Sequence, residues 1–456
     1  MENGGQSPAA EEKISMLRAV MTSVGELGAS LKRNVRAAKR KADLRRLIDS
    51  CHALLSERGE ASGVAIASDS ISHIQALDVD QTRQFFAALV ADFSPQPTEV
   101  MAHAHRFATT PSQANLVALQ RAAEAPRQEL FRRLNMAPGG TAALVSLRKQ
   151  LLGLLDEQPE LVGVDSDLLH LFQSWFNRGF LELRRIDWQT SAAVLEKLIA
   201  YEAVHAMRGW EDLRRRLDRD RRCFAFFHPA LPGEPLIFVE VALTDGMAAS
   251  VQPLLASGPI TDTAKANCAI FYSITNCQEG LRGVSFGNFL IKQVAADLQR
   301  ELPRLKTFAT LSPIPGFRRW LDKTLPTLVD PAYTGLAAQL ASPDWASDAD
   351  LAARMAEPLT RLCASYLVHA KRGTLPLDPV ERFHLANGAR LERINWRGDT
   401  SEKGIRESAT LMVNYVYALD DVEANHQAYA TQNTVVASRQ VLTLAARAVA
   451  GANGKA

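Results

Sequence analysis

The chain has 456 residues, of which 47% are hydrophobic and 22% charged, and its formal net charge is +2. This length predicts two or three globular domains with a sizeable apolar core. The near-zero net charge does not indicate a nucleic-acid-binding protein. No apolar run approaches the roughly 20 residues that a membrane-spanning helix needs.

The N-terminal segment, MENGGQSPAAEEKISM, carries acidic residues and lacks an apolar core, so it fits neither a secretory signal nor an organelle transit peptide. The five cysteines are scattered without metal-ligand spacing, which favours free thiols in a reducing compartment. We therefore expect a cytoplasmic protein with no metal site, no nucleic-acid partner and no membrane partner.

Residues 1–170 follow helical periodicity almost throughout, which predicts an all-helical N-terminal domain. Start signals stand at Asp80, Pro111 and Pro126. Residues 31–46 hold eight basic side chains, but no aromatic residue interleaves with them, so a solvated or subunit-facing helix surface is favoured over a nucleic-acid or lipid patch. The expected helices span residues 11–24, 36–57, 80–92, 98–107, 111–124, 126–134 and 141–155.

We expect residues 171–456 to form a second domain. Helical periodicity continues to about residue 201. Residues 214–223, RRRLDRDRRC, are interpreted as an exposed, charged helix end in preference to a phosphate clamp. Residues 223–244 contain two strand-like runs joined by a turn rich in proline and glycine, which is typical of a hairpin.

Residues 268–317 form the most informative stretch of the chain. The pattern predicts a crossover unit that ends in a rigid turn after Ser312. Its elements are an apolar strand over 269–274, a glycine loop, a helix over 286–302 and a strand over 306–311. The loop precedes a helix N-terminus, where free backbone N–H groups suit a phosphate.

Mostly helical residues follow to position 374, and then comes a short helix with clear signals. Asp378 is expected to cap it, with Pro379 at its first position and Glu381 returning a capping-box contact, and Gly388 is expected to end it in a left-handed conformation. Strands over 389–396 and 411–419 and an amphipathic helix over 432–449 complete the prediction.

This element order resembles GNAT-type acyl-CoA transferases, whose glycine loop binds the coenzyme A pyrophosphate through backbone N–H groups. In that family a Tyr four residues before a Gly gives a proton to the leaving thiolate; here His384 stands four residues before Gly388, which predicts a proton donor that titrates near neutrality. The core strands offer no obvious acidic base for deprotonating an amine. The corresponding loop, RGVSFGN, contains Arg282, Gly283, Val284, Ser285, Phe286, Gly287 and Asn288.

A sharper resemblance covers most of residues 170–420. A series of motifs follows the order found in the malonyl-CoA decarboxylase family. The motifs are RRCFAFFH, PGEPL, AIFYSIT, GLRGVSFGNFLIK, LSPIPGF, FHLANGA, RINW and LMVNYVY. The resemblance implies that Ser312 and His384 are the functional pair and that Tyr417 belongs to the substrate pocket. It also implies an α+β fold, with an all-helical domain before a GNAT-like mixed-sheet catalytic domain that carries a helical insertion.

The implied substrate and product are malonyl-CoA and acetyl-CoA, and we expect a homo-oligomer, a dimer or tetramer, that assembles through the helical domain. Loss of carbon dioxide leaves an electron pair that the thioester carbonyl accepts as an enolate, so no cofactor is required beyond the coenzyme A of the substrate. The protein must orient the carboxylate, stabilise the enolate oxygen and supply a proton. We expect Ser312 to orient the substrate and His384 to protonate it.

Other interpretations remain open. Ser312 also fits a turn-capping hydroxyl, and His384 a hydrogen-bonded residue at a helix end. At the level of function, the alternatives are an acyl-CoA N-acyltransferase of the GNAT type and a non-catalytic acyl-CoA sensor or scaffold.

Overall fold

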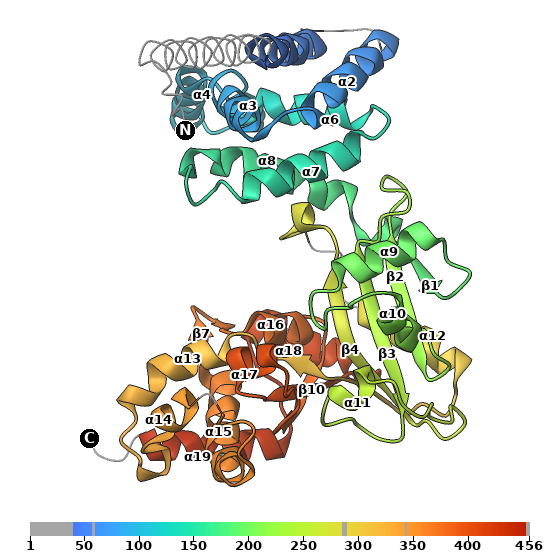
Figure 1. Cartoon of the computed structure of the whole chain (residues 1–456). Helices are drawn as coiled ribbons and strands as arrows, with labels where there is room; N and C mark the ends of the chain where they lie inside the picture. Colours follow the sequence, from blue (N-terminus) through green and yellow to red (C-terminus); the bar gives the residue numbers. More distant parts are fainter. Residues whose placement is uncertain (1–39, 57–59, 285–289, 343, 453–456) are drawn as a thin grey trace, which may run out of the picture. The chain divides into compact units, whose positions relative to one another are not determined.

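The computed structural model describes residues 40–56, 60–284, 290–342 and 344–452. The chain divides into two compact units: a helical unit that ends at residue 175 and also includes residues 280–284, and a sheet unit made of the rest (Figure 1). The expected helix over 11–24 lies outside the described residues, and so do Ser285, Phe286, Gly287 and Asn288 of the glycine loop.

The described part of the helical unit confirms the all-helical prediction, although individual helix starts differ. Asp78, not Asp80, caps the second labelled helix, because its carboxylate accepts from the Gln81 N–H while the Gln81 side chain accepts from the Asp78 N–H. Ser112, not Pro111, caps another helix, whereas Pro126 begins one as expected. A helix over residues 60–75 was missed. The helices are residues 40–56, α2 (Glu60–Gln75), α3 (Val79–Ala91), α4 (Pro97–Thr109), α5 (Gln113–Ala123), α6 (Pro126–Asn135), α7 (Gly140–Leu152) and α8 (Val162–Trp175).

A mixed sheet dominates the other unit, with strands in the order β1-β2-β3-β4-β5-β10-β6 and β9 on β10. The predicted hairpin is β2–β3, and the predicted crossover unit is the parallel pair β4–β5, joined through α12 (Leu290–Glu301). The other pairs in this sheet are antiparallel. The α+β fold class is therefore confirmed. The strands are β1 (Glu182–Ile186), β2 (Arg221–Phe227), β3 (Ile237–Thr244), β4 (Cys268–Asn276), β5 (Thr307–Thr310), β6 (Ser312–Pro313), β9 (Arg390–Asn395) and β10 (Met412–Val416).

Two predictions in this unit were wrong. Residues 182–186, expected to be helical, form the edge strand β1, because antiparallel pairing with β2 overrides their local helix preference. Residues 214–223 are not an exposed charged end. Arg215 is buried with its guanidinium 2.8 Å from the Asp220 carboxylate, and Arg216 is buried with Nε 3.5 Å from Glu240, so an acidic side chain accompanies each arginine into the interior.

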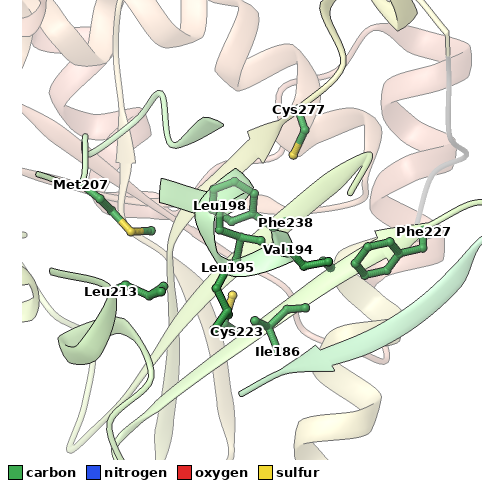
Figure 2. Packing of buried hydrophobic residues seen from close by; sticks show 11 residues of the cluster. Ile186, Val194, Leu195, Leu198, Met207, Leu213, Cys223, Phe227, Phe238 and Cys277 are labelled. Carbon is green, nitrogen blue, oxygen red and sulfur yellow. The ribbon is translucent and has the colours of Figure 1, made fainter. Parts of the chain in front are cut away.

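Helices α9 (Ala192–Tyr201) and α10 (Trp210–Arg216) cover one face of the sheet. Figure 2 shows Val194, Leu195 and Leu198 of α9 gathered with strand residues such as Phe238 in one apolar cluster. Phe238 and Ala242 share a face because side chains alternate along a strand, and Ala242 belongs to a second apolar cluster. The buried Glu240 lies between them on that face.

The remaining helices lie at the other end of the sheet unit, where α15 packs against α19 (Figure 1). The last helix starts later than predicted, at Arg439, and none of the helices in the described part of the chain is both long and apolar enough to span a bilayer. These helices are α13 (Phe317–Thr324), α14 (Leu336–Ala341), α15 (Ala349–His369), α16 (Pro379–Ala386), α17 (Glu402–Ser408), α18 (Val422–Gln432) and α19 (Arg439–Ala452), with a small hairpin of β7 (Lys371–Arg372) and β8 (Leu375–Pro376).

Candidate active site

The sheet opens where β4 and β5 part. Their pairing ends at Phe271 and Thr310. Beyond this point β4 continues to Asn276, while the segment that follows β5 forms β6, which pairs with β10. A pocket of about 230 Å³, here called the acyl pocket, lies between the diverging segments and is closed by α16. Ser312 and His384 both line it, and no Asp, Glu, Lys or Arg is among its described lining residues.

Ser312 and His384 come together although 72 residues separate them in the chain: Ser312 Oγ lies 2.9 Å from His384 Nε2. The Ser312 hydroxyl is also 2.9 Å from Thr310 Oγ1, which accepts in turn from the Tyr415 N–H at 3.1 Å. Thr310 and Ser312 are two positions apart and point to the same side of the extended chain. The serine hydroxyl is therefore fixed between a threonine and an imidazole.

Helix α16 delivers His384, and most of its predicted end signals are present. Asp378 accepts from the N–H groups of Val380 and Glu381 at 2.9 and 3.1 Å, and Gly388 ends the helix at φ +80°. The predicted return contact of Glu381 is not made, because both of its carboxylate oxygens are buried without a hydrogen-bond partner. Burial raises the pKa of Glu381 well above its usual value.

The second nitrogen of His384 faces the protein interior. Nδ1 lies 2.8 Å from the Tyr417 hydroxyl, and the ring stacks on Tyr415 with centroids 4.5 Å apart. Burial lowers the pKa of His384 to about 3, so the expectation that it titrates near neutrality was wrong. Tyr417 lies behind the imidazole and does not line the acyl pocket. Ser312, His384 and Tyr417 form one continuous hydrogen-bonded chain that starts at the pocket.

The described start of the glycine loop belongs to the helical unit. Arg148 Nη1 donates to the carbonyls of Gly280 and Arg282, each at 2.8 Å, while its Nε pairs with Asp165. Only glycine fits at position 280, since a Cβ there would lie 1.9 Å from the Val145 carbonyl oxygen. Arg282 and Gly283 are exposed, and Gly283 has φ +85°. No sequence motif singled out Arg148, a lone arginine in an amphipathic helix.

Glu202 is a second residue that sequence reasoning missed. Its Oε1 accepts from the N–H groups of Val204 and His205 at 2.8 and 2.7 Å, and the same carboxylate accepts from the Ser273 and Thr275 hydroxyls on β4. Val204 lines the acyl pocket. The buried carboxylate therefore ties one wall of the pocket to the strand that forms another wall.

Thiol and metal chemistry find little support in the described residues. All five cysteines are buried, and burial raises the pKa of Cys268, at the start of β4, to about 11. The described part of the chain holds no group of three His, Cys, Asp or Glu side chains arranged for a metal ion.

Known proteins match almost the whole described chain. Family models match residues 93–176 as a malonyl-CoA decarboxylase N-terminal domain and residues 179–453 as a malonyl-CoA decarboxylase C-terminal domain. The mitochondrial malonyl-CoA decarboxylase of Anser anser anser is 40% identical over 343 residues, which are 69% of this chain and 68% of the relative. That of Rattus norvegicus is 38% identical over 347 residues, 70% of each chain.

Solved structures agree with this similarity. Crystal structures of malonyl-CoA decarboxylases from Rhodopseudomonas palustris and Agrobacterium vitis are 49% and 47% identical to this chain, with TM-scores of 0.84 and 0.82. Each comparison covers 88% of this chain and 99% of the other.

Proposed function

The chain belongs to the malonyl-CoA decarboxylase family and is a carboxy-lyase, and we propose that Ser312 and His384 carry out its reaction. The reaction converts malonyl-CoA to acetyl-CoA and carbon dioxide. The observation that supports this assignment is the hydrogen-bonded chain from Ser312 through His384 to Tyr417, which begins at the wall of an uncharged pocket.

The bond between the carboxylate carbon and the α-carbon breaks, and its electron pair moves toward the thioester carbonyl to form an enolate. Carbon dioxide leaves, and the α-carbon then takes one proton, which balances the reaction. The substrate is its own electron sink, so we propose that no further cofactor takes part. The Ser312 hydroxyl, which donates to Thr310 Oγ1 in this structure, would turn to donate to the developing oxyanion or to the departing carboxylate, and one such donor is typically worth about 3 kcal/mol of barrier.

His384 must act as a neutral imidazole, since burial keeps its pKa at about 3. With Nδ1 accepting from the Tyr417 hydroxyl, the ring hydrogen stands on Nε2, the nitrogen nearest Ser312 and the pocket. That hydrogen can pass to the α-carbon, directly or through Ser312, while the Tyr417 proton moves onto Nδ1, so the imidazole stays neutral and the negative charge of the enolate ends on the Tyr417 oxygen. Burial raises the pKa of Tyr417, so a proton from solvent must return to its oxygen to complete the turnover.

The test is turnover of malonyl-CoA by the purified protein with no acceptor amine, measured as acetyl-CoA and carbon dioxide. His384→Asn should lower kcat by about 100-fold or more, the range for lost general acid catalysis, while binding of coenzyme A measured by calorimetry stays near that of the parent. Full turnover by the variant would remove His384 from the mechanism. Turnover that requires an added amine would instead indicate an N-acyltransferase, and tight binding with no turnover would indicate a sensor.

Other assignments remain proposals. The glycine loop would hold the coenzyme A pyrophosphate, and Arg148 would anchor the start of this loop. The loop residues are Arg282, Gly283, Val284, Ser285, Phe286, Gly287 and Asn288. We propose residues 171–456 as the catalytic domain and residues 1–170 as the domain through which a dimer or tetramer assembles. Location in the cytoplasm stays a prediction, and the two curated relatives are named as mitochondrial proteins.

A further inference from the structure

A second pocket of the sheet unit, of about 350 Å³, is lined by four basic side chains and by no Asp or Glu. We call it the basic pocket. Arg319 and Lys323 come from α13, Arg372 from β7 and Arg382 from α16, so three separate elements bring positive charge to one place. The proposed decarboxylation uses none of these residues.

Most of this charge is unpaired. Arg319, Lys323 and Arg372 are exposed, and none of them forms an ion pair with a described residue. Arg382 is held in place by bonds from Nη1 to the carbonyls of Pro376 and Leu377 at 2.8 and 3.0 Å. Converging like charges repel one another, so an anion bound among them would be stabilised by all four.

Two carboxylates that neighbour these side chains in the sequence already have other partners: Asp322 of α13 pairs with Arg318, and Asp378 caps α16. Asp378 is buried, and its Oδ1 accepts from the first N–H groups of α16. Its Oδ2 lies 3.4 Å from both the Gly316 nitrogen and the Tyr366 hydroxyl. Burial raises the pKa of Asp378 above its usual value.

An aromatic ring completes the lining. Trp320 is half-buried, and its ring packs against Tyr366 with centroids 5.2 Å apart. An indole held among guanidinium groups offers a surface for a flat base, while the guanidinium groups offer paired N–H donors for phosphate oxygens. Pro379 lines both this pocket and the acyl pocket, so the two adjoin.

From this lining we propose that the basic pocket binds the phosphate groups and the base of a nucleotide. The ligand chemistry has two sources, a free nucleotide and the adenosine 3′-phosphate of the substrate, whose pyrophosphate residues 282–288 would hold; the second rests on the proposed function. Four converging cations and one aromatic face suit a polyanionic, base-bearing ligand better than a carboxylic acid or a peptide.

The test compares the parent with an Arg319→Glu/Lys323→Glu double variant in the full chain. Both side chains are exposed on α13, so the fold should tolerate the change. The matched control, Arg439→Glu/Arg447→Glu, makes the same change in net charge at two exposed positions on α19, outside both pockets. Each protein is assayed with malonyl-CoA and with malonyl-N-acetylcysteamine, which lacks the nucleotide, and is titrated by calorimetry with ATP and with adenosine 3′,5′-bisphosphate.

If the substrate's nucleotide occupies the pocket, the variant should show a KM for malonyl-CoA about tenfold higher, the effect of losing roughly one charge-assisted hydrogen bond. Its kcat and its turnover of malonyl-N-acetylcysteamine should match the parent. If a free nucleotide occupies the pocket, the variant should lose ATP or bisphosphate affinity by a similar factor with no change in KM. The proposal is overturned if the variant and the control share both the KM and the nucleotide affinities of the parent. Failure of the parent to decarboxylate either substrate would instead count against the proposed function.

Discussion

Tyr417→Phe isolates the inner end of the proton path. The substitution keeps the ring and removes only the hydroxyl, which lies 2.8 Å from His384 Nδ1. A buried imidazole nitrogen is then left without its partner, which costs about 1 to 3 kcal/mol. If the cost falls on the transition state, kcat drops by roughly 5- to 150-fold, since 1.4 kcal/mol corresponds to a factor of ten. KM should stay unchanged, because Tyr417 does not line the acyl pocket.

The assay is the rate of acetyl-CoA formation over a range of malonyl-CoA concentrations, together with a thermal unfolding curve to exclude a folding defect. Tyr415→Phe is the matched comparison, since it keeps the ring that stacks on His384 at 4.5 Å and removes a hydroxyl elsewhere. The kcat of Tyr415→Phe should fall much less than that of Tyr417→Phe. A kcat for Tyr417→Phe within twofold of the parent, or a loss confined to KM, would refute the proton path.

Two further predictions concern the buried carboxylates on the α9 and α10 side of the sheet. Glu202→Gln can keep an amide oxygen on the Val204 and His205 N–H groups, but its NH2 group then faces the Ser273 and Thr275 hydroxyls, which donate to the carboxylate in the parent. The pocket wall should loosen: we expect KM to rise several-fold and stability to fall by about 1 to 3 kcal/mol in urea titrations, and parental values of both would contradict the role of Glu202 in tying the wall to β4. Glu240 has its pKa raised by burial from 4.5 to about 8, although the Arg216 guanidinium opposes the shift. Between those values the folded chain holds a proton that the unfolded chain has lost, so stability should fall as pH rises through this window, by up to about 1.4 kcal/mol per pH unit. Glu240→Gln should remove this part of the pH dependence, and an unchanged slope between pH 5 and 8 in urea titrations would show that Glu240 is ionised in the folded chain.

Local signals in the sequence were sufficient for much of the site's framework. The cap at Asp378 and the left-handed Gly388 are short-range features, and each was predicted correctly from its own residues. The turn predicted at Ser312 begins only at Pro315, because Ser312 and Pro313 pair with β10 as β6. The family motifs singled out Ser312 and His384 as a pair, and their side chains lie 2.9 Å apart.

Features that depend on distant partners were not predictable in this way. The low pKa of His384 comes from burial, which a heptapeptide motif does not report. The pairing of Arg216 with Glu240 joins a helix end to the middle of a strand. In the sequence, the charged residues around Arg216 look the same as those of a charged segment that is exposed to solvent. Arg148 bonds to carbonyls more than 130 residues away and leaves no local pattern at all.

The separation of charge between the two pockets gives a physical reason for decarboxylation. In the proposed reaction the malonyl carboxylate would enter the acyl pocket, whose described lining offers no cation, so the carboxylate would lose hydration there without gaining an ion pair. Carbon dioxide leaves as a neutral molecule, and the charge that stays behind spreads onto an oxygen within reach of donors such as Ser312. A lysine or arginine in that wall would stabilise the bound carboxylate more than the transition state, and would therefore tighten binding while slowing turnover. The cations stand instead in the adjoining basic pocket, where they can attract a polyanionic substrate without touching the group that must leave.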